Sequence, residues 1–205
     1  MHALQRVLAF PLSSSDKRAY NHFRKQLRRP NRADFDRAVL LILEAEKPLC
    51  QDVISQSHIV FGSCAVALYR IYCAQGLGQT AALQHMETPI TTYGKTSSQF
   101  FMWLMRLTSR QPFNAVRTYT IRHMPDRYGA LFRFAFEDMQ DGFASVVTTC
   151  GFRDLLERHG AIELLELFCE WDRVWIEALP PSIRFNRPLT IAKGAKTCRF
   201  EFRQE

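Results

Sequence analysis

The sequence predicts an α+β protein in which a mainly helical N-terminal half packs on an antiparallel sheet of about four strands. Apolar residues recur at helical spacing in the first hundred residues, whereas apolar and polar residues alternate within 128–149. A second pair of extended segments, 183–192 and 197–203, closes the chain. With 205 residues and 47% apolar content, the chain suits one domain with a full core.

Four helices are expected in the first half. The helix over 34–47 begins with acidic residues and ends before Pro48. The helix over 57–75 is apolar enough to be largely buried, and it runs into Gly76, a residue that commonly follows helix ends. Shorter helices follow near 78–87 and at about 96–108, separated by Pro89 and Gly94.

A hairpin is expected next, because segments 128–138 and 143–149 flank the turn residues Gln140, Asp141 and Gly142. This hairpin delivers Cys150 at the end of its second strand. Helical segments then follow at about 152–159 and 161–178.

The last two strands, 183–192 and 197–203, are joined by a turn at 193–196. Cys198 therefore lies at the start of the final strand.

The first 33 residues are expected to form a basic extension to a single domain over 34–205. The formal net charge is +7, and the segment 16–37 supplies most of it, since its eight basic and three acidic residues give +5. No nucleic-acid motif accompanies this segment. We therefore interpret it as a solvated face and expect no nucleic-acid partner.

The chain is expected to be cytoplasmic and to have no membrane partner. By the sequence pattern, no stretch reaches the roughly 18 uncharged apolar residues of a membrane span, and the first fifteen residues lack the features of a signal peptide. The six cysteines are irregularly spaced and form no C-x-x-C pair, which is typical of reduced thiols.

Cys169 and Asp172 are candidate functional residues because helical spacing places them on one stripe of the 161–178 helix. The other members of that stripe are apolar: Leu165, Ile176 and Leu179. A carboxylate on such a surface is either paired or protonated. One interpretation is a structural salt bridge to Arg187 with Cys169 as a core residue, and the other is a reactive site.

Several separated motifs occur in a characteristic order near the end of the chain. They are Cys150, then Cys169-Glu170-Trp171-Asp172, then Arg187-Pro188-Leu189-Thr190-Ile191-Ala192-Lys193-Gly194, and finally Cys198-Arg199-Phe200. From about His58 to Arg203, the chain resembles the L-2-amino-thiazoline-4-carboxylic acid hydrolase family, small bacterial proteins named for opening a cyclic isothiourea. The residues that match the family pattern are Cys150, Cys169, Asp172, Arg187, Thr190, Gly194 and Cys198.

The resemblance implies a hydrolase that acts on a C–N bond of a small cyclic amidine, with a biosynthetic tailoring role open to it. Cys169 or Cys198 would be the nucleophile, and Asp172 would hold a cation or transfer a proton. Arg187 would grip a substrate carboxylate. Cys150, Thr190 and His58 would complete the substrate site. Lys193 and Arg199 stand where the family has acidic residues, a change that would reverse the site's preference for ligand charge.

Two alternatives stay open at this point. The expected reaction needs no cofactor, but Cys150, Cys169, Cys198 and Asp172 could instead hold a zinc ion with a hydrolytic water. The chain could also be a non-catalytic small-molecule binding or scaffold protein on the same fold. The oligomeric state stays open as well.

Overall fold

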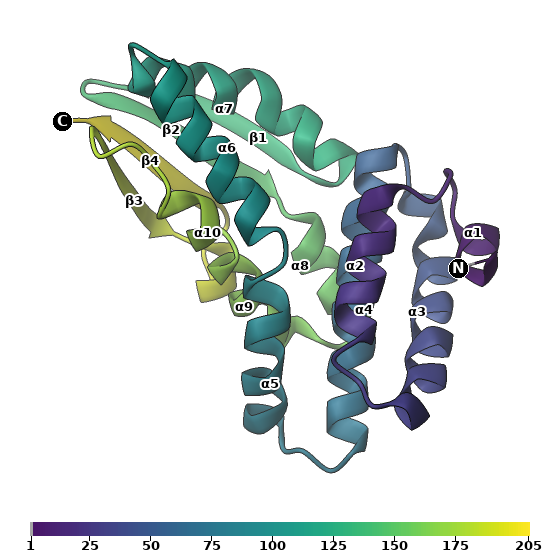
Figure 1. The fold of residues 1–205 in the computed structure, drawn as a ribbon. Coiled ribbons are helices and arrows are strands. Elements are labelled where there is room, and N and C mark those ends of the chain that lie inside the picture. The colour runs from purple at the N-terminus through teal and green to yellow at the C-terminus, as the bar shows by residue number, and fades with distance from the viewer. Residues whose placement is uncertain (1) are drawn as a thin grey trace. The chain divides into compact units, whose positions relative to one another are not determined.

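The computed structural model describes residues 2–205, and the contacts among them form two compact units (Figure 1). The first unit contains the chain up to Tyr93 together with Gly151–Phe168, and the second contains Gly94–Cys150 together with Cys169–Glu205. The contacts thus divide the chain differently from the expected N-terminal extension followed by one domain.

The first unit is helical. Its helices are α1 (His2–Val7), α2 (Ser14–Arg24), α3 (Arg32–Glu46), α4 (Val53–Ala74), α5 (Gln79–Thr91), α8 (Gly151–Arg158) and the start of α9 (Leu165–Glu170). Short 3-10 turns lie at η1 (Arg29–Asn31), η2 (Lys47–Leu49) and η4 (Ile162–Leu164). Helix α4 is the centre of this unit and packs against α2, α3, α5 and α8. Asp52 caps it by accepting a hydrogen bond from the Ser55 backbone N–H at 2.7 Å.

Helix α4 is long and apolar enough to cross a membrane by length and composition alone. In the structure, 61% of its most apolar window is buried. The predicted helix over 57–75 is thus found as a core helix, and its packing against four neighbours accounts for its hydropathy.

Helix α2 lies within the expected extension over 1–33, and in the structure it is part of the first unit. Tyr20 and Phe23 are buried, and α2 packs against α4. Asp36 of α3 accepts hydrogen bonds from the Tyr20 hydroxyl and from Arg24, the latter at 2.7 Å. Part of the basic segment is therefore neutralised internally.

The second unit contains the sheet. Its helices are α6 (Lys95–Thr108), α7 (Pro112–Tyr128) and α10 (Arg173–Ile176), with 3-10 turns η3 (Gly129–Leu131) and η5 (Ile191–Lys193). Its strands are β1 (Arg133–Met139), β2 (Gly142–Thr149), β3 (Ile183–Leu189) and β4 (Cys198–Gln204). They form one antiparallel sheet in the order β1-β2-β4-β3. The predicted α+β class and four-stranded sheet are confirmed.

The two faces of the sheet differ in chemistry. Phe143 of β2 is paired with Phe202 of β4, and their rings stack with centroids 4.7 Å apart. Phe113 of α7 and Trp175, from α10, pack on this aromatic face. The opposite face carries a row of charged residues on β4, which begins at Arg199 and continues at every second position. In the second unit, α7 and α10 thus pack on the aromatic face.

Two local expectations are wrong. Residue 128 ends helix α7 instead of beginning a strand, and the sequence pattern does not predict α7, because apolar residues are poorly segregated along it. The expected helix over 161–178 is broken after Glu170 and resumes at Arg173. The apolar stripe expected to contain Cys169 and Asp172 therefore does not lie on one continuous helix.

Candidate functional site

Three predicted site residues lie at one end of the sheet in the second unit. Cys150 follows the last residue of β2, Thr190 follows the last residue of β3, and Cys198 opens β4 opposite Val147. Antiparallel pairing brings the end of one strand to the start of its neighbour. These residues therefore lie at the same end of the sheet, although 48 positions separate Cys150 from Cys198.

Arg187 of β3 connects this end of the sheet to the break between helices α9 and α10. Its Nη1 donates to the Cys169 carbonyl oxygen at 3.0 Å and to Oδ2 of Asp172 at 3.4 Å. In a continuous helix, the Cys169 carbonyl would accept the backbone N–H of the residue four positions later. Here it accepts the Asp172 backbone N–H, three positions later, at 3.3 Å in addition to the Arg187 side chain. The guanidinium lies over the Phe200 ring at 5.8 Å. A side chain from β3 thus holds the broken turn in place.

Asp172 is a shielded carboxylate with two donors. Its side chain is 17% exposed, the Trp175 indole N–H donates to Oδ1 at 3.2 Å, and Arg187 approaches Oδ2. Burial raises the pKa of Asp172 to about 6, although the Trp175 hydrogen bond and the Arg187 charge both lower it. The structure therefore places a carboxylate that titrates near neutrality at the predicted position.

The neighbouring thiols are kept protonated. Burial raises the pKa of Cys169 to about 12, and the charges of Asp172 and Cys198 add to this effect. Burial also raises the pKa of Cys198, but its sulfur accepts the Ile191 backbone N–H at 3.2 Å, which lowers that pKa. Cys198 therefore has a backbone donor that stabilises a thiolate.

Thr190 is held beside Cys198 by a tight turn. Its carbonyl oxygen accepts the backbone N–H groups of Lys193 and Ala195, and Gly194 has a positive φ of 86°. Thr190 is 7% exposed as a residue, and its hydroxyl has no hydrogen-bond partner among the described residues. An unsatisfied buried hydroxyl at this place is suited to a ligand.

Some predicted residues are placed elsewhere. His58 belongs to α4 of the first unit, where its ring lies 5.4 Å from that of Phe152. Arg199 is on the charged face of the sheet and pairs with Glu137 at 2.6 Å and Glu201 at 2.8 Å. The expected reversal of ligand charge at this position is therefore wrong, since Arg199 is neutralised on the face opposite Cys198.

The structure gives no support for a zinc site. In the part of the chain that it describes, no group of three or more His, Cys, Asp or Glu side chains is arranged to hold a metal ion. The six cysteines, all within the described residues, are reduced thiols and not disulfides.

Two cavities of the second unit lie away from the cysteines. One, of about 460 Å³, is lined by α6 and α7 residues such as Met105, Tyr119 and His123. The other, of about 550 Å³, lies around Asp141 and Arg184. The expectation of a pocket lined by Cys150, Cys169, Cys198 and Asp172 does not correspond to either cavity.

Sequence reasoning missed three groups that shape the site: the Trp175 indole, the Ile191 backbone N–H and the Phe200 ring. Trp175 stands three positions after Asp172, a spacing at which helical side chains meet, so it could have been found. The Ile191 N–H depends on a turn that only the structure reveals.

A family model described as L-2-amino-thiazoline-4-carboxylic acid hydrolase matches residues 56–202. No curated protein and no solved structure matches the chain. The matched residues include every position of the site in the second unit and most of the first unit's core helix. The chain therefore belongs to the L-2-amino-thiazoline-4-carboxylic acid hydrolase family.

Proposed function

We propose that the protein is a hydrolase that opens a small cyclic amidine or isothiourea, with Asp172 transferring protons and Cys198 acting as the nucleophile. The observation that carries this proposal is the position of Asp172, held by Trp175 and Arg187 and electrostatically coupled to the thiols of Cys169 and Cys198. Membership of a family named for a hydrolase supports the reaction class.

The proposed steps balance in atoms and protons. Asp172 accepts the Cys198 thiol proton while the sulfur bonds to the amidine carbon of the ring. The bond from that carbon to a ring heteroatom breaks, and the heteroatom takes the proton from Asp172. Water then attacks the same carbon and the bond to Cys198 breaks. One water proton restores the thiol, the other goes to the amidine nitrogen, and the water oxygen becomes the carbonyl oxygen of the product. The net change is the addition of one water molecule, and no cofactor takes part.

Cys198 is preferred to Cys169 because of their different surroundings. The Ile191 N–H points at the Cys198 sulfur and would stabilise negative charge there. Burial raises the pKa of Cys169 to about 12, and its backbone carbonyl is the group that Arg187 binds. Cys169 and Cys150 are proposed as wall residues of the substrate site.

Arg187 is proposed as a positioning residue in place of a direct substrate grip, because it already binds Cys169 and Asp172 and lies 3.8 Å from Glu170. Thr190 is the better candidate for a direct hydrogen bond to substrate, since its buried hydroxyl has no hydrogen-bond partner among the described residues. His58 belongs to the first unit, and its assignment to the substrate site depends on the family resemblance alone, so it has no role in the proposed steps. Cytoplasmic location stays a proposal too.

The test is a ring-opening assay on 2-amino-thiazoline-4-carboxylate and related cyclic amidines, with products identified by mass spectrometry. We expect turnover by the wild type, loss of at least about a hundredfold in Asp172→Asn and Cys198→Ser, and a smaller loss in Cys169→Ser. Cys73→Ser, on α4 in the first unit, is the matched control.

Full activity in Cys198→Ser would refute the covalent step. Stoichiometric binding of such compounds without any turnover, retained in both Asp172→Asn and Cys198→Ser, would favour the non-catalytic binding protein instead.

A further inference from the structure

Helix α6 presents an apolar ridge on its exposed side. The ridge consists of Phe100, Trp103, Leu104 and Leu107, whose exposed fractions are 60%, 52%, 42% and 62%. The rings of Phe100 and Trp103 stack on each other with centroids 5.7 Å apart. The helix is anchored to its own unit by other residues, since Met102 is buried in the core and Met105 packs against it. The ridge therefore plays no part in that core.

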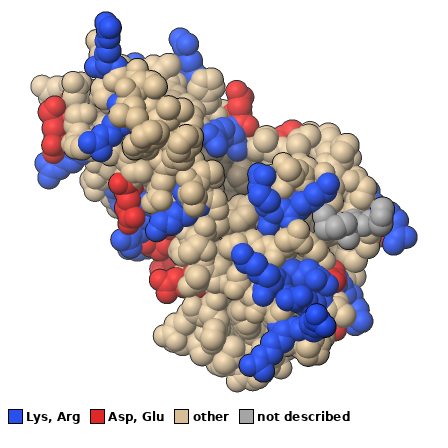
Figure 2. Space-filling view, viewed as in Figure 1, with Lys and Arg blue, Asp and Glu red and all other residues tan. Residues whose placement is uncertain are grey.

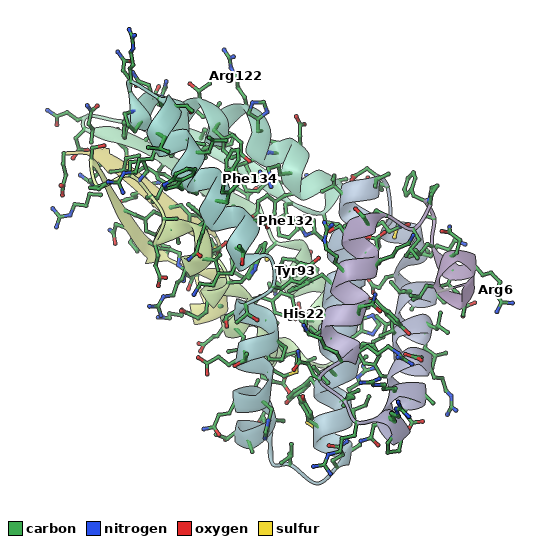
Figure 3. The ribbon with its side chains drawn as sticks, in the orientation of Figure 1. Arg6, His22, Tyr93, Arg122, Phe132 and Phe134 are labelled. Carbon is green, nitrogen blue, oxygen red and sulfur yellow. The ribbon has the colours of Figure 1, made fainter. Side chains whose placement is uncertain are left out.

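Cations lie on and beside α6. Lys95 and Arg106 are exposed on α6 itself, and Arg110 follows the helix. Arg127 of α7 lies over the Phe101 ring at 5.8 Å, next to the ridge on the other edge. Arg122 extends away from α7 (Figure 3). On the face that Figure 2 draws, Lys and Arg outnumber Asp and Glu.

Acidic residues are missing from this part of the sequence. From Thr88 to Pro125, a stretch of 38 residues, there is no Asp or Glu. An anionic surface that approaches α6 would therefore meet cations, apolar side chains and uncharged polar side chains from this stretch, but no carboxylate.

We propose that the α6 ridge is a docking surface for an anionic lipid bilayer. Aromatic and leucine side chains on one helix face, flanked by Lys and Arg, are the pattern of helices that lie in the membrane interface. Such a helix enters the headgroup region without spanning the bilayer. The expectation of no membrane partner was based on the lack of a span and does not apply to this binding mode.

The flanking charges favour this occupant over a second copy of the chain. An isologous dimer through the ridge would bring Arg106 and Lys95 of one copy toward like charges of the other, which is unfavourable. Anionic headgroups would instead attract both edges of the ridge.

The experiment is co-sedimentation of the full chain with phosphatidylcholine vesicles that contain or lack phosphatidylglycerol. We expect binding to the anionic vesicles only, weakened by salt, with a blue shift in tryptophan emission. Leu107→Ser should weaken binding at least about fivefold, and Arg106→Gln with Arg110→Gln at least about tenfold. Leu41→Ser is the matched control, because Leu41 on α3 is 63% exposed against 62% for Leu107.

The proposal is overturned by no binding to anionic vesicles, or by equal binding of Leu107→Ser and Leu41→Ser. It is also overturned if light scattering shows a dimer that Leu107→Ser abolishes and no vesicle binding occurs, since a second copy would then cover the ridge. Circular dichroism of each variant checks that the fold is retained.

Discussion

Cys198 and Arg199 are neighbours in the chain but lie on opposite faces of the sheet. Cys198 shares its face with Val147 and Phe200, where helices pack, whereas Arg199 pairs with Glu137 and Glu201 on the charged face. Successive side chains of a strand point to opposite faces of the sheet. The candidate nucleophile Cys198 and the structural cation Arg199 are therefore on different faces although they are adjacent in sequence. A charge change in a motif therefore need not change the charge of the site.

The first prediction compares two arginines that the sequence motifs place close together. Arg187→Gln removes a charge that lowers the pKa of Asp172, so we expect that pKa to rise above about 6. Arg199→Gln should leave it unchanged, because Arg199 is on the other face. The measurement is an NMR titration of the Asp172 carboxyl. Equal shifts in both variants would contradict the assignment of Arg187 as the positioning residue.

Much of the architecture could be predicted from the sequence because it depends on periodicity. The hairpin around Asp141, the last two strands and the core helix α4 all follow from spacing and turn residues. Cys150 and Cys198 were correctly placed at strand ends for the same reason.

The break at Asp172 could not be predicted, because the contacts made there include a side chain from a later strand. Arg187 donates a hydrogen bond to the Cys169 carbonyl oxygen, and nothing in the sequence pattern of 161–178 predicts this contact. The pairing of Arg199 with Glu137 likewise joins residues 62 positions apart. Long-range contacts of this kind override local propensity.

The second prediction concerns Gly142, where β2 begins. A Cβ at this position would lie 1.9 Å from the Phe202 carbonyl oxygen, which is backbone and cannot move aside cheaply. Gly142→Ala should destabilise the second unit by about 3 kcal/mol or more, as overpacking does. Gly78→Ala is the control, since nothing lies within 4 Å of its Cβ position. Urea unfolding checks both, and a Gly142→Ala curve that overlays the Gly78→Ala curve would refute the close approach.

The third prediction concerns thiol reactivity. The negative charge of Asp172 helps to raise the pKa of Cys169, so Asp172→Asn should lower that pKa and increase the thiolate fraction. We expect iodoacetamide to modify Cys169 several-fold faster in this variant at pH 8, while the rate at Cys73 stays constant. Peptide mass spectrometry gives both rates in one sample. An unchanged Cys169 rate would mean that Asp172 and Cys169 are not electrostatically coupled.

The last prediction uses Asp172→Asn to measure how much the ionised Asp172 carboxylate lowers the free energy of unfolding. The folded pKa of about 6 lies above the unfolded value of about 3.9, so the folded state binds the Asp172 proton more tightly. Stability from this group is present below about pH 4 and is lost as the pH rises toward and through 6. A shift of about two units corresponds to about 3 kcal/mol.

Asparagine has no such titration, so the variant should gain stability relative to the wild type by about 2 kcal/mol between pH 4 and pH 8. All three tryptophans, at positions 103, 171 and 175, belong to the second unit, so their fluorescence during urea unfolding reports on the unit that contains the site. Leu41→Ser in the first unit should show a constant difference from the wild type at every pH. A constant difference for Asp172→Asn as well would mean that Asp172 keeps an ordinary pKa. A gain in stability together with a loss of ring opening would identify Asp172 as a residue kept for chemistry at the expense of the fold.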